Sequence, residues 1–250
     1  MWSFSNTMRT TTKKPSWKPS LGSFSKAVSG AISLNFGESG GVNCSTKCEA
    51  LKLGVCYAVH TEKLKPSIQT SGERKRKHGF AKVCLEYRNQ IERLESKGKV
   101  IPWIRFSTFG SVPNRRLTGV EMQAFADLVR SFPSGVPVHF PVETKEKAER
   151  FRAIAVAFDL SLVVRESCQS DRRANEALAE NSPASRIVYK GDNKRERLAN
   201  AQKLARKSKG KARVCPAIAS TILRRANPVK CGQCTLCARG DVNLILYPQH

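Results

Sequence analysis

The chain has 250 residues, enough to bury one large core or two small ones. It carries 44 lysines and arginines against 20 acidic residues, a formal net charge of +24, so we expect an acidic partner, with nucleic acid the leading class. No apolar run approaches the roughly 18 residues of a membrane-spanning helix, and the first residues lack a secretory apolar core, so a cytoplasmic protein without membrane contact is expected.

The N-terminal part of the chain predicts an arm, a strand, a loop and a helix. Residues 1–28 are rich in Ser, Thr, Lys and Pro and are expected to form a flexible basic arm. Residues 31–36 predict a short strand, and a Gly-rich loop follows over 36–42. Residues 71–97 have a helical pattern whose apolar face carries Phe80, Val83, Cys84, Tyr87, Ile91 and Leu94.

Strands and helices then alternate along the chain. The expected strands cover residues 100–109, 137–142, 160–165, 185–190 and 212–214. The expected helices cover residues 118–132, 144–158 and 193–207, and a polar segment follows the strand at 160–165. This alternation predicts an α/β domain over residues 29–214, with a parallel sheet of about six βα units that is open or forms a partial barrel.

Two groups of closely spaced cysteines point to metal binding. In a chain without a secretion signal, such cysteines are more typical of metal sites than of disulfides. The first group, Cys44, Cys48 and Cys56, has three thiols, which suit a four-iron cluster with one open iron. Structural zinc normally has four ligands, and His60 is a candidate for the fourth, so zinc is the alternative metal.

The second group lies in the C-terminal residues 215–250, which predict a cysteine-rich, metal-binding appendage. Cys231, Cys234 and Cys237 form a C-x2-C-x2-C run typical of ferredoxin-type cluster loops, and Cys215 would supply the fourth thiolate. Four-cysteine zinc fits the ligand count equally well. The two groups together predict one or two 4Fe–4S clusters.

The layout of a strand, a Gly-containing loop, Cys44, Cys48 and Cys56-Tyr57-Ala58, and then βα units resembles the radical S-adenosylmethionine enzymes. The usual family spacing is CxxxCxxC, whereas the second gap here has seven residues. The Cys-Tyr-Ala signature and the late Cys231-Gly-x-Cys234-x-x-Cys237 are more similar to the phage gene eighty-eight protein family. This resemblance implies a phage- or plasmid-encoded protein in the host cytoplasm.

The resemblance to radical enzymes implies that Cys44, Cys48 and Cys56 hold a cluster whose open iron binds S-adenosylmethionine. Residues at the strand ends would then line the substrate site: Arg105, Ser107, His139, Glu143, Arg165, Glu166 and Lys190. The catalytic candidates are Glu143, Glu166 and Cys168, and a packed loop thiol is the alternative for Cys168.

The alternative function is a non-enzymatic, basic nucleic-acid-binding protein with structural metal sites. The candidate phosphate contacts are Arg74, Lys75, Arg76, Lys77, Arg206, Lys207, Lys209, Lys211, Arg224 and Arg225. Each basic run alone is equally typical of a solvated helix face. The sequence has no GxxxxGK, HExxH or GxSxG motif, so nucleotide hydrolysis and ordinary hydrolase chemistry have no support.

Overall fold

The computed structural model describes residues 22–23, 32–37, 52, 57–64, 66–106, 111–229 and 234–248. The strands are β1 (Gly22–Ser23), β2 (Ile32–Leu34), β3 (Ile104–Phe106), β4 (Val138–Val142), β5 (Val164–Cys168), β6 (Ala184–Val188), β7 (Ala212–Val214) and β8 (Leu244–Pro248). The helices are α2 (Tyr57–Leu64), α3 (Pro66–His78), α4 (Phe80–Ser96), α5 (Gly119–Arg130), α6 (Lys145–Ala157), α7 (Asp171–Ala179), α8 (Lys194–Lys207), α9 (Pro216–Ile222) and the 3-10 turn η1 (Leu236–Ala238).

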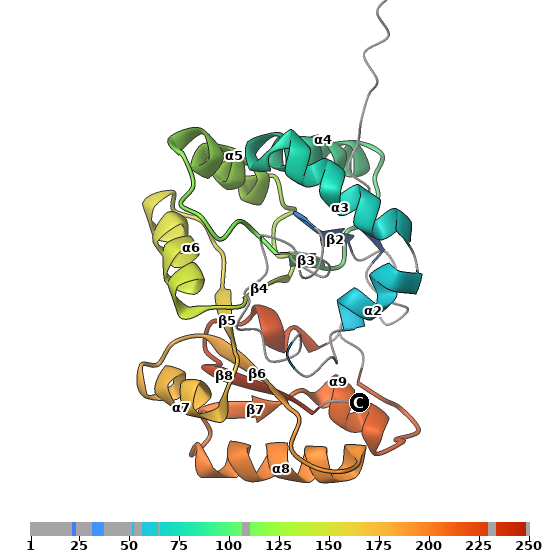
Figure 1. The fold of residues 1–250 in the computed structure, drawn as a ribbon, viewed down its shortest axis with the longest axis vertical. Helices are drawn as coiled ribbons and strands as arrows, with labels where there is room; N and C mark the ends of the chain where they lie inside the picture. Colours follow the sequence, from blue (N-terminus) through green and yellow to red (C-terminus); the bar gives the residue numbers. More distant parts are fainter. Residues whose placement is uncertain are drawn as a thin grey trace, which may run out of the picture.

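The described strands form one sheet in the order β1-β2-β3-β4-β5-β6-β8-β7. The strands β2 to β8 pair in parallel, and only β1 pairs antiparallel, at the edge. The predicted α/β class and parallel sheet are therefore confirmed. Figure 1 shows α4, α5, α6, α7 and α8 following one another around the outside of the strands.

Both predicted appendages of the α/β domain contribute strands to this sheet. β1 falls within the predicted N-terminal arm, and it pairs with β2; the rest of residues 1–28 lies outside the described residues. β8 pairs with β6 on one side and with β7 on the other. The structure therefore does not show residues 215–250 as a separate appendage, because β8 lies inside the sheet.

Local capping signals fix the helix starts. The Thr118 hydroxyl accepts a hydrogen bond from the Glu121 amide, and the Glu121 carboxylate accepts one from the Thr118 amide, which completes a capping box. Thr144 and Asn193 cap α6 and α8 in the same way with their side chains. The predicted helix at 71–97 is divided at Gly79, whose φ of +81° is a left-handed conformation that glycine adopts without strain.

Two elements differ from the sequence-based prediction. The strand expected at 160–165 is β5, four residues later, so Cys168 is the last residue of the strand. The polar segment after it contains α7, which begins after the cap Ser170. The strand was predicted to end too early because Arg165 and Glu166 are charged. Both are nevertheless buried within β5.

On the helix-covered face of the sheet, one half is packed with large aromatic side chains and the other half with small side chains. Phe106, Phe125, Phe140 and Phe151 pack in tilted and T-shaped pairs between β3, β4, α5 and α6. Under α7 and α8 the buried residues are mostly small, among them Ala174, Ala177, Ala184, Ala201 and Ala212. No described helix is long and apolar enough to cross a membrane.

Candidate functional site

The two faces of the sheet have opposite chemistry. Residues paired in register lie on the same face, and successive residues of one strand alternate between faces. The face away from α5, α6, α7 and α8 therefore carries Arg105 beside His139, then Arg165 beside Pro141, and Tyr247 beside Ile187. His139 and Arg165 are buried, with 7% and 0% of their surface exposed. A buried sheet face with this many polar groups is unusual for a simple core, and we call it the polar face.

Arg165 fastens the second cysteine group to the polar face. Its Nε donates to the carbonyl of Cys237 at 2.8 Å, and its Nη1 donates to the carbonyl of Val242 at 2.8 Å. Nη1 also lies 3.4 Å from the carbonyl of Ala184, and Nη2 donates to the carbonyl of Arg239. Each recorded acceptor is a backbone carbonyl, so among the described residues this buried cation has hydrogen bonds but no carboxylate partner.

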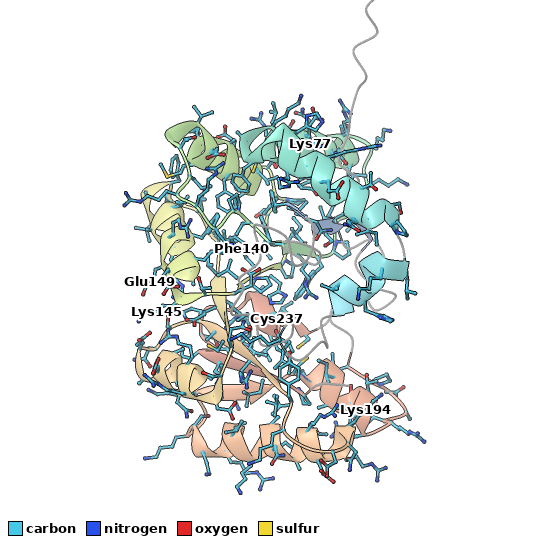
Figure 2. The ribbon with its side chains drawn as sticks, in the orientation of Figure 1. Lys77, Phe140, Lys145, Glu149, Lys194 and Cys237 are labelled. Carbon is cyan, nitrogen blue, oxygen red and sulfur yellow. The ribbon has the colours of Figure 1, made fainter. Side chains whose placement is uncertain are left out.

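The Cys237 thiol lies beside a tyrosine at the end of the last strand. Its Sγ is 2.9 Å from the Tyr247 hydroxyl. Burial is the main cause that raises the pKa of Tyr247 well above 10, and the nearby Cys237 raises it further. The hydroxyl therefore keeps its proton at neutral pH and can donate to the sulfur. Cys215, which is 6% exposed, packs in the same small cluster with Val242 and Ile245. Figure 2 shows Cys237 near the centre of the molecule.

These residues fit a thiolate-bound metal. A site of four thiolates around zinc or a four-iron cluster carries net negative charge, and a buried guanidinium behind Cys237 supplies compensating positive charge. A hydroxyl that donates to a ligand sulfur is a recurrent partner of such sites. Two of the four predicted ligands, Cys215 and Cys237, are thus brought to one cluster with Tyr247.

The remaining predicted ligands are placed less completely. Cys234 is half-buried, and Cys44, Cys48, Cys56 and Cys231 lie outside the described residues. Among the described residues, no three His, Cys, Asp or Glu side chains gather closely enough to hold a metal ion. His60, the candidate fourth zinc ligand, is exposed on α2.

Next to the cysteine cluster, the polar face carries two buried side chains with unsatisfied nitrogens. His139 Nε2 and Trp103 Nε1 have no hydrogen-bond partner among the described residues. Burial lowers the pKa of His139 well below 6.5, and the nearby Arg105 and Arg165 lower it further, so the imidazole is neutral at pH 7. Because Trp103 immediately precedes β3, strand alternation places it on the same face as Arg105.

Glu143, a predicted catalytic residue, follows β4 at the carboxyl edge of the sheet. Its carboxylate lies 2.8 Å from Lys147 Nζ, and 19% of its side chain is exposed. Lys147 is almost fully buried and also donates to Ser111 Oγ at 3.2 Å and the Val112 carbonyl at 3.1 Å. Lys147 therefore ties the chain after β3 to the start of α6 and holds the Glu143 carboxylate in place at this edge.

Glu166 and Cys168, the other two catalytic candidates, lie on the opposite, helix-covered face. Both Glu166 oxygens accept from Arg173 at 2.8 Å, and Arg173 also binds Glu176 and Glu180. Cys168 is buried among alanines. Its burial, and to a smaller extent the negative charge of Glu166, raise the pKa of the Cys168 thiol to about 12. This geometry fits the packing alternative for Cys168 and a structural ion pair for Glu166.

Nine of the ten predicted nucleic-acid contacts are exposed; the exception is Lys75. Lys75 is 4% exposed, its Nζ lies 5.6 Å from the centre of the Tyr87 ring, and burial lowers its pKa to about 8. It is therefore part of the α3–α4 packing. The exposed residues are Arg74, Arg76, Lys77, Arg206, Lys207, Lys209, Lys211, Arg224 and Arg225. Figure 2 shows Lys77 on α3 and Lys194 on α8 near opposite ends of the molecule.

Sequence reasoning did not single out Tyr247, Trp103, Lys147 or Arg173. Tyr247 is the one polar side chain in an apolar terminal strand, which was a usable signal. Lys147 lies four residues after Glu143 and Arg173 three residues before Glu176, so their local pairs were also usable signals. Their contacts with Ser111 and Glu166 are identified only by the folded structure.

No protein-family model, no curated protein and no solved structure matches the chain. The case for its function therefore depends on its own residues.

Proposed function

We propose that this protein is an iron–sulfur protein that resembles radical S-adenosylmethionine enzymes, with a partial-barrel fold whose polar face forms the reaction chamber. The single observation that carries the proposal is the set of hydrogen bonds from Arg165 to the segment that bears Cys237. A fully buried cation holds three carbonyls of the segment that bears Cys237, in a cluster that also contains Cys215. Such a device suits a site where several thiolates gather negative charge.

The topology supports a second cluster site at the other end of the polar face. In a parallel sheet the carboxyl ends of all strands meet at one edge, where βα folds place their chemistry. The chain leaves β2 at this edge and reaches Cys44, Cys48 and Cys56 before α2 begins. The Cys-Tyr-Ala signature and the similarity to the phage gene eighty-eight protein family belong to this part of the proposal.

The chain's own residues have defined tasks in this proposal. Cys44, Cys48 and Cys56 would hold a four-iron cluster, which would supply one-electron chemistry to bound S-adenosylmethionine. Arg105 offers a cation to carboxylate or phosphate groups, and the neutral His139 offers one ring nitrogen for a hydrogen bond. Glu143, paired with Lys147 at the carboxyl edge and partly exposed, is the candidate that remains for proton transfer.

The deciding experiment is anaerobic purification with iron, sulfide and zinc analysis and an ultraviolet–visible spectrum. About eight irons per chain are expected, falling by half when Cys44, Cys48 and Cys56 are all replaced by alanine. A double Cys84→Ala, Cys168→Ala variant is the matched control, because both thiols are buried on the helix-covered face. Zinc without iron would refute the iron–sulfur proposal.

A second candidate function is nucleic-acid binding with structural metal sites, and the exposure of the basic residues favours it. α8 carries the sequence KRERLANAQKLARK, with six basic residues and one acidic residue. The two functions are compatible, since an enzyme can act on nucleic acid. Binding of DNA or RNA should weaken steeply with added salt, and an interaction that is absent or insensitive to salt would exclude this candidate.

A further inference from the structure

A pocket opens between α7 and α8 on the helix-covered face of the sheet, remote from the polar face. Its volume is about 460 Å³, within the range of small-molecule sites. Leu244 and Leu246 of β8 form its floor, and Leu178 and Leu204 form its walls. The pocket exists because alanines, not large side chains, fill the layer between these two helices and the sheet. Figure 1 shows α7 and α8 at this end of the molecule.

The rim of the pocket is strongly cationic. Its charged lining residues are four cations, Arg186, Lys207, Lys209 and Lys211, against one carboxylate, Asp171. Arg186 is buried and donates to Asp171 at 3.0 Å, while Lys211 donates to an amide oxygen. In the part of the chain that the structure describes, Lys207 and Lys209 form no side-chain hydrogen bond or ion pair. Two exposed cations at the pocket mouth are therefore available to a ligand.

The negative end of the α8 helix dipole does not explain why several lysines gather at this rim. A helix carboxyl terminus carries about half a negative charge, which one basic residue in the last turn offsets. Arg206 already lies in that turn with Lys207. Lys209 and Lys211 come after the helix, in a turn where Lys209 has a φ of +52° and Gly210 a φ of +89°. This left-handed turn brings the lysines to the pocket rim.

We propose that this pocket binds one nucleotide of a nucleic-acid strand, with the base against the leucines and the phosphate on Lys207 and Lys209. An apolar floor beneath a cationic rim matches a molecule with a flat, weakly polar body and an attached anion. The basic surface of α8 continues from the rim, so neighbouring phosphates of the same strand would follow the helix. The chain's own residues 1–28 are a poor alternative occupant of the pocket. They carry five basic and no acidic residues, so they have no anion to place on the cationic rim.

This inference rests on the nucleic-acid part of the proposed function and does not depend on the metal. The test is calorimetric titration of the full chain with adenosine monophosphate, orthophosphate and a short single-stranded oligonucleotide. The double variant Lys207→Gln, Lys209→Gln removes the two free rim charges. Lys194→Gln, Lys203→Gln removes two exposed charges from the same helix outside the pocket lining and serves as the control.

We expect the rim variant to bind the mononucleotide at least tenfold more weakly, and the control variant to lose less than twofold. The oligonucleotide should displace the mononucleotide, and orthophosphate should compete far less well, because it lacks the base. Asn175→Trp, at an exposed lining position of α7, should fill the mouth and abolish mononucleotide binding without changing the melting temperature or the metal content.

Four results would overturn the proposal. Equal losses in the rim and control variants would mean that net charge alone binds the ligand. Equal competition by orthophosphate would leave only an anion site. A mononucleotide that the oligonucleotide cannot displace would identify a site for free nucleotides. Salt-dependent oligonucleotide binding without any mononucleotide binding would keep the nucleic-acid function and exclude this pocket.

Discussion

Replacing Arg165 with methionine tests how the cysteine segment is held. Methionine keeps an unbranched apolar stem but removes every donor, so the carbonyls of Cys237, Arg239 and Val242 lose their partner. At about 1 kcal/mol for each buried acceptor left unsatisfied, the free energy of unfolding should fall by about 3 kcal/mol. For a domain of this size, that loss lowers the melting temperature by roughly 6–12 °C.

The assay pairs thermal unfolding with metal content, and Arg152→Met is the matched control. Arg152 is also partly buried and donates to the carbonyls of Val164 and Pro183 and to the Ser182 hydroxyl, so none of its hydrogen bonds among the described residues reaches the cysteine segment. Both variants should lose stability, whereas only Arg165→Met should lose bound metal, by about 10- to 100-fold in affinity. Equal metal retention in the two variants would refute the role we give to Arg165.

Three further predictions concern single side chains. Tyr247→Phe removes the hydrogen bond to Cys237, so the reduction potential of the bound cluster should become more negative in a redox titration. The Arg115 hydrogen bond lowers the pKa of Glu121 to about 2, below its value of 4.5 in the unfolded chain, so this stabilisation is complete above about pH 4.5 and is lost as the pH falls towards 2. Glu121→Gln should therefore remove about 1–2 kcal/mol of pH-dependent unfolding free energy in that window, since Arg115 is exposed. Cys168, whose pKa is raised to about 12, should resist alkylation at pH 8 in the folded protein, as measured by mass spectrometry.

Each of these predictions has a control within the chain. Tyr87→Phe removes a buried hydroxyl that binds the backbone of Asn35 instead of Cys237, and it should leave the potential unchanged. Glu92→Gln breaks an exposed pair with Arg88 and should leave the pH dependence of unfolding nearly unchanged. The half-buried Cys234 should be alkylated in the metal-free protein under conditions that spare Cys168. A result in which target and control behave alike would contradict the corresponding prediction.

The elements that were predictable from sequence are those whose signals are local. Thr118, Thr144 and Asn193 lie at helix starts, and each caps its own helix within three residues. The apolar face of α4 followed from a helical repeat; five of its six residues are buried, and Leu94 packs half-buried against the same core. Such signals need no knowledge of distant contacts.

The parts that were misplaced depend on distant partners. Arg165 and Glu166 looked like the end of a strand, because a pair of charges normally lies at the surface. Arg165 donates hydrogen bonds to carbonyls more than 70 residues away, and Glu166 is paired with Arg173 on a helix that was not expected. The exposed pair of Arg172 with Glu176, four residues apart, was an available signal for that helix.

The candidate site was predictable in composition and only partly in arrangement. The cysteine spacing identified Cys215 and Cys237, and strand-end reasoning identified Arg105, His139 and Arg165. Reasoning from strand ends could not divide these residues between the two faces, because a shift of one residue in a strand reverses the face of every side chain. The observed register places Arg165 on the polar face and Glu166 on the other.

The place of β8 in the sheet has a consequence for the order in which the protein folds. Among the described strands β7 pairs only with β8, so the unit of α8 and β7 has no described strand to join until residues 244–248 have been synthesised. Until then β6 presents an open edge, where another chain could add a strand. The final strand must then bridge two edges at once, a non-local step that is expected to be slow. Ribosome-bound chains that stop before residue 244 should therefore be the most prone to aggregation.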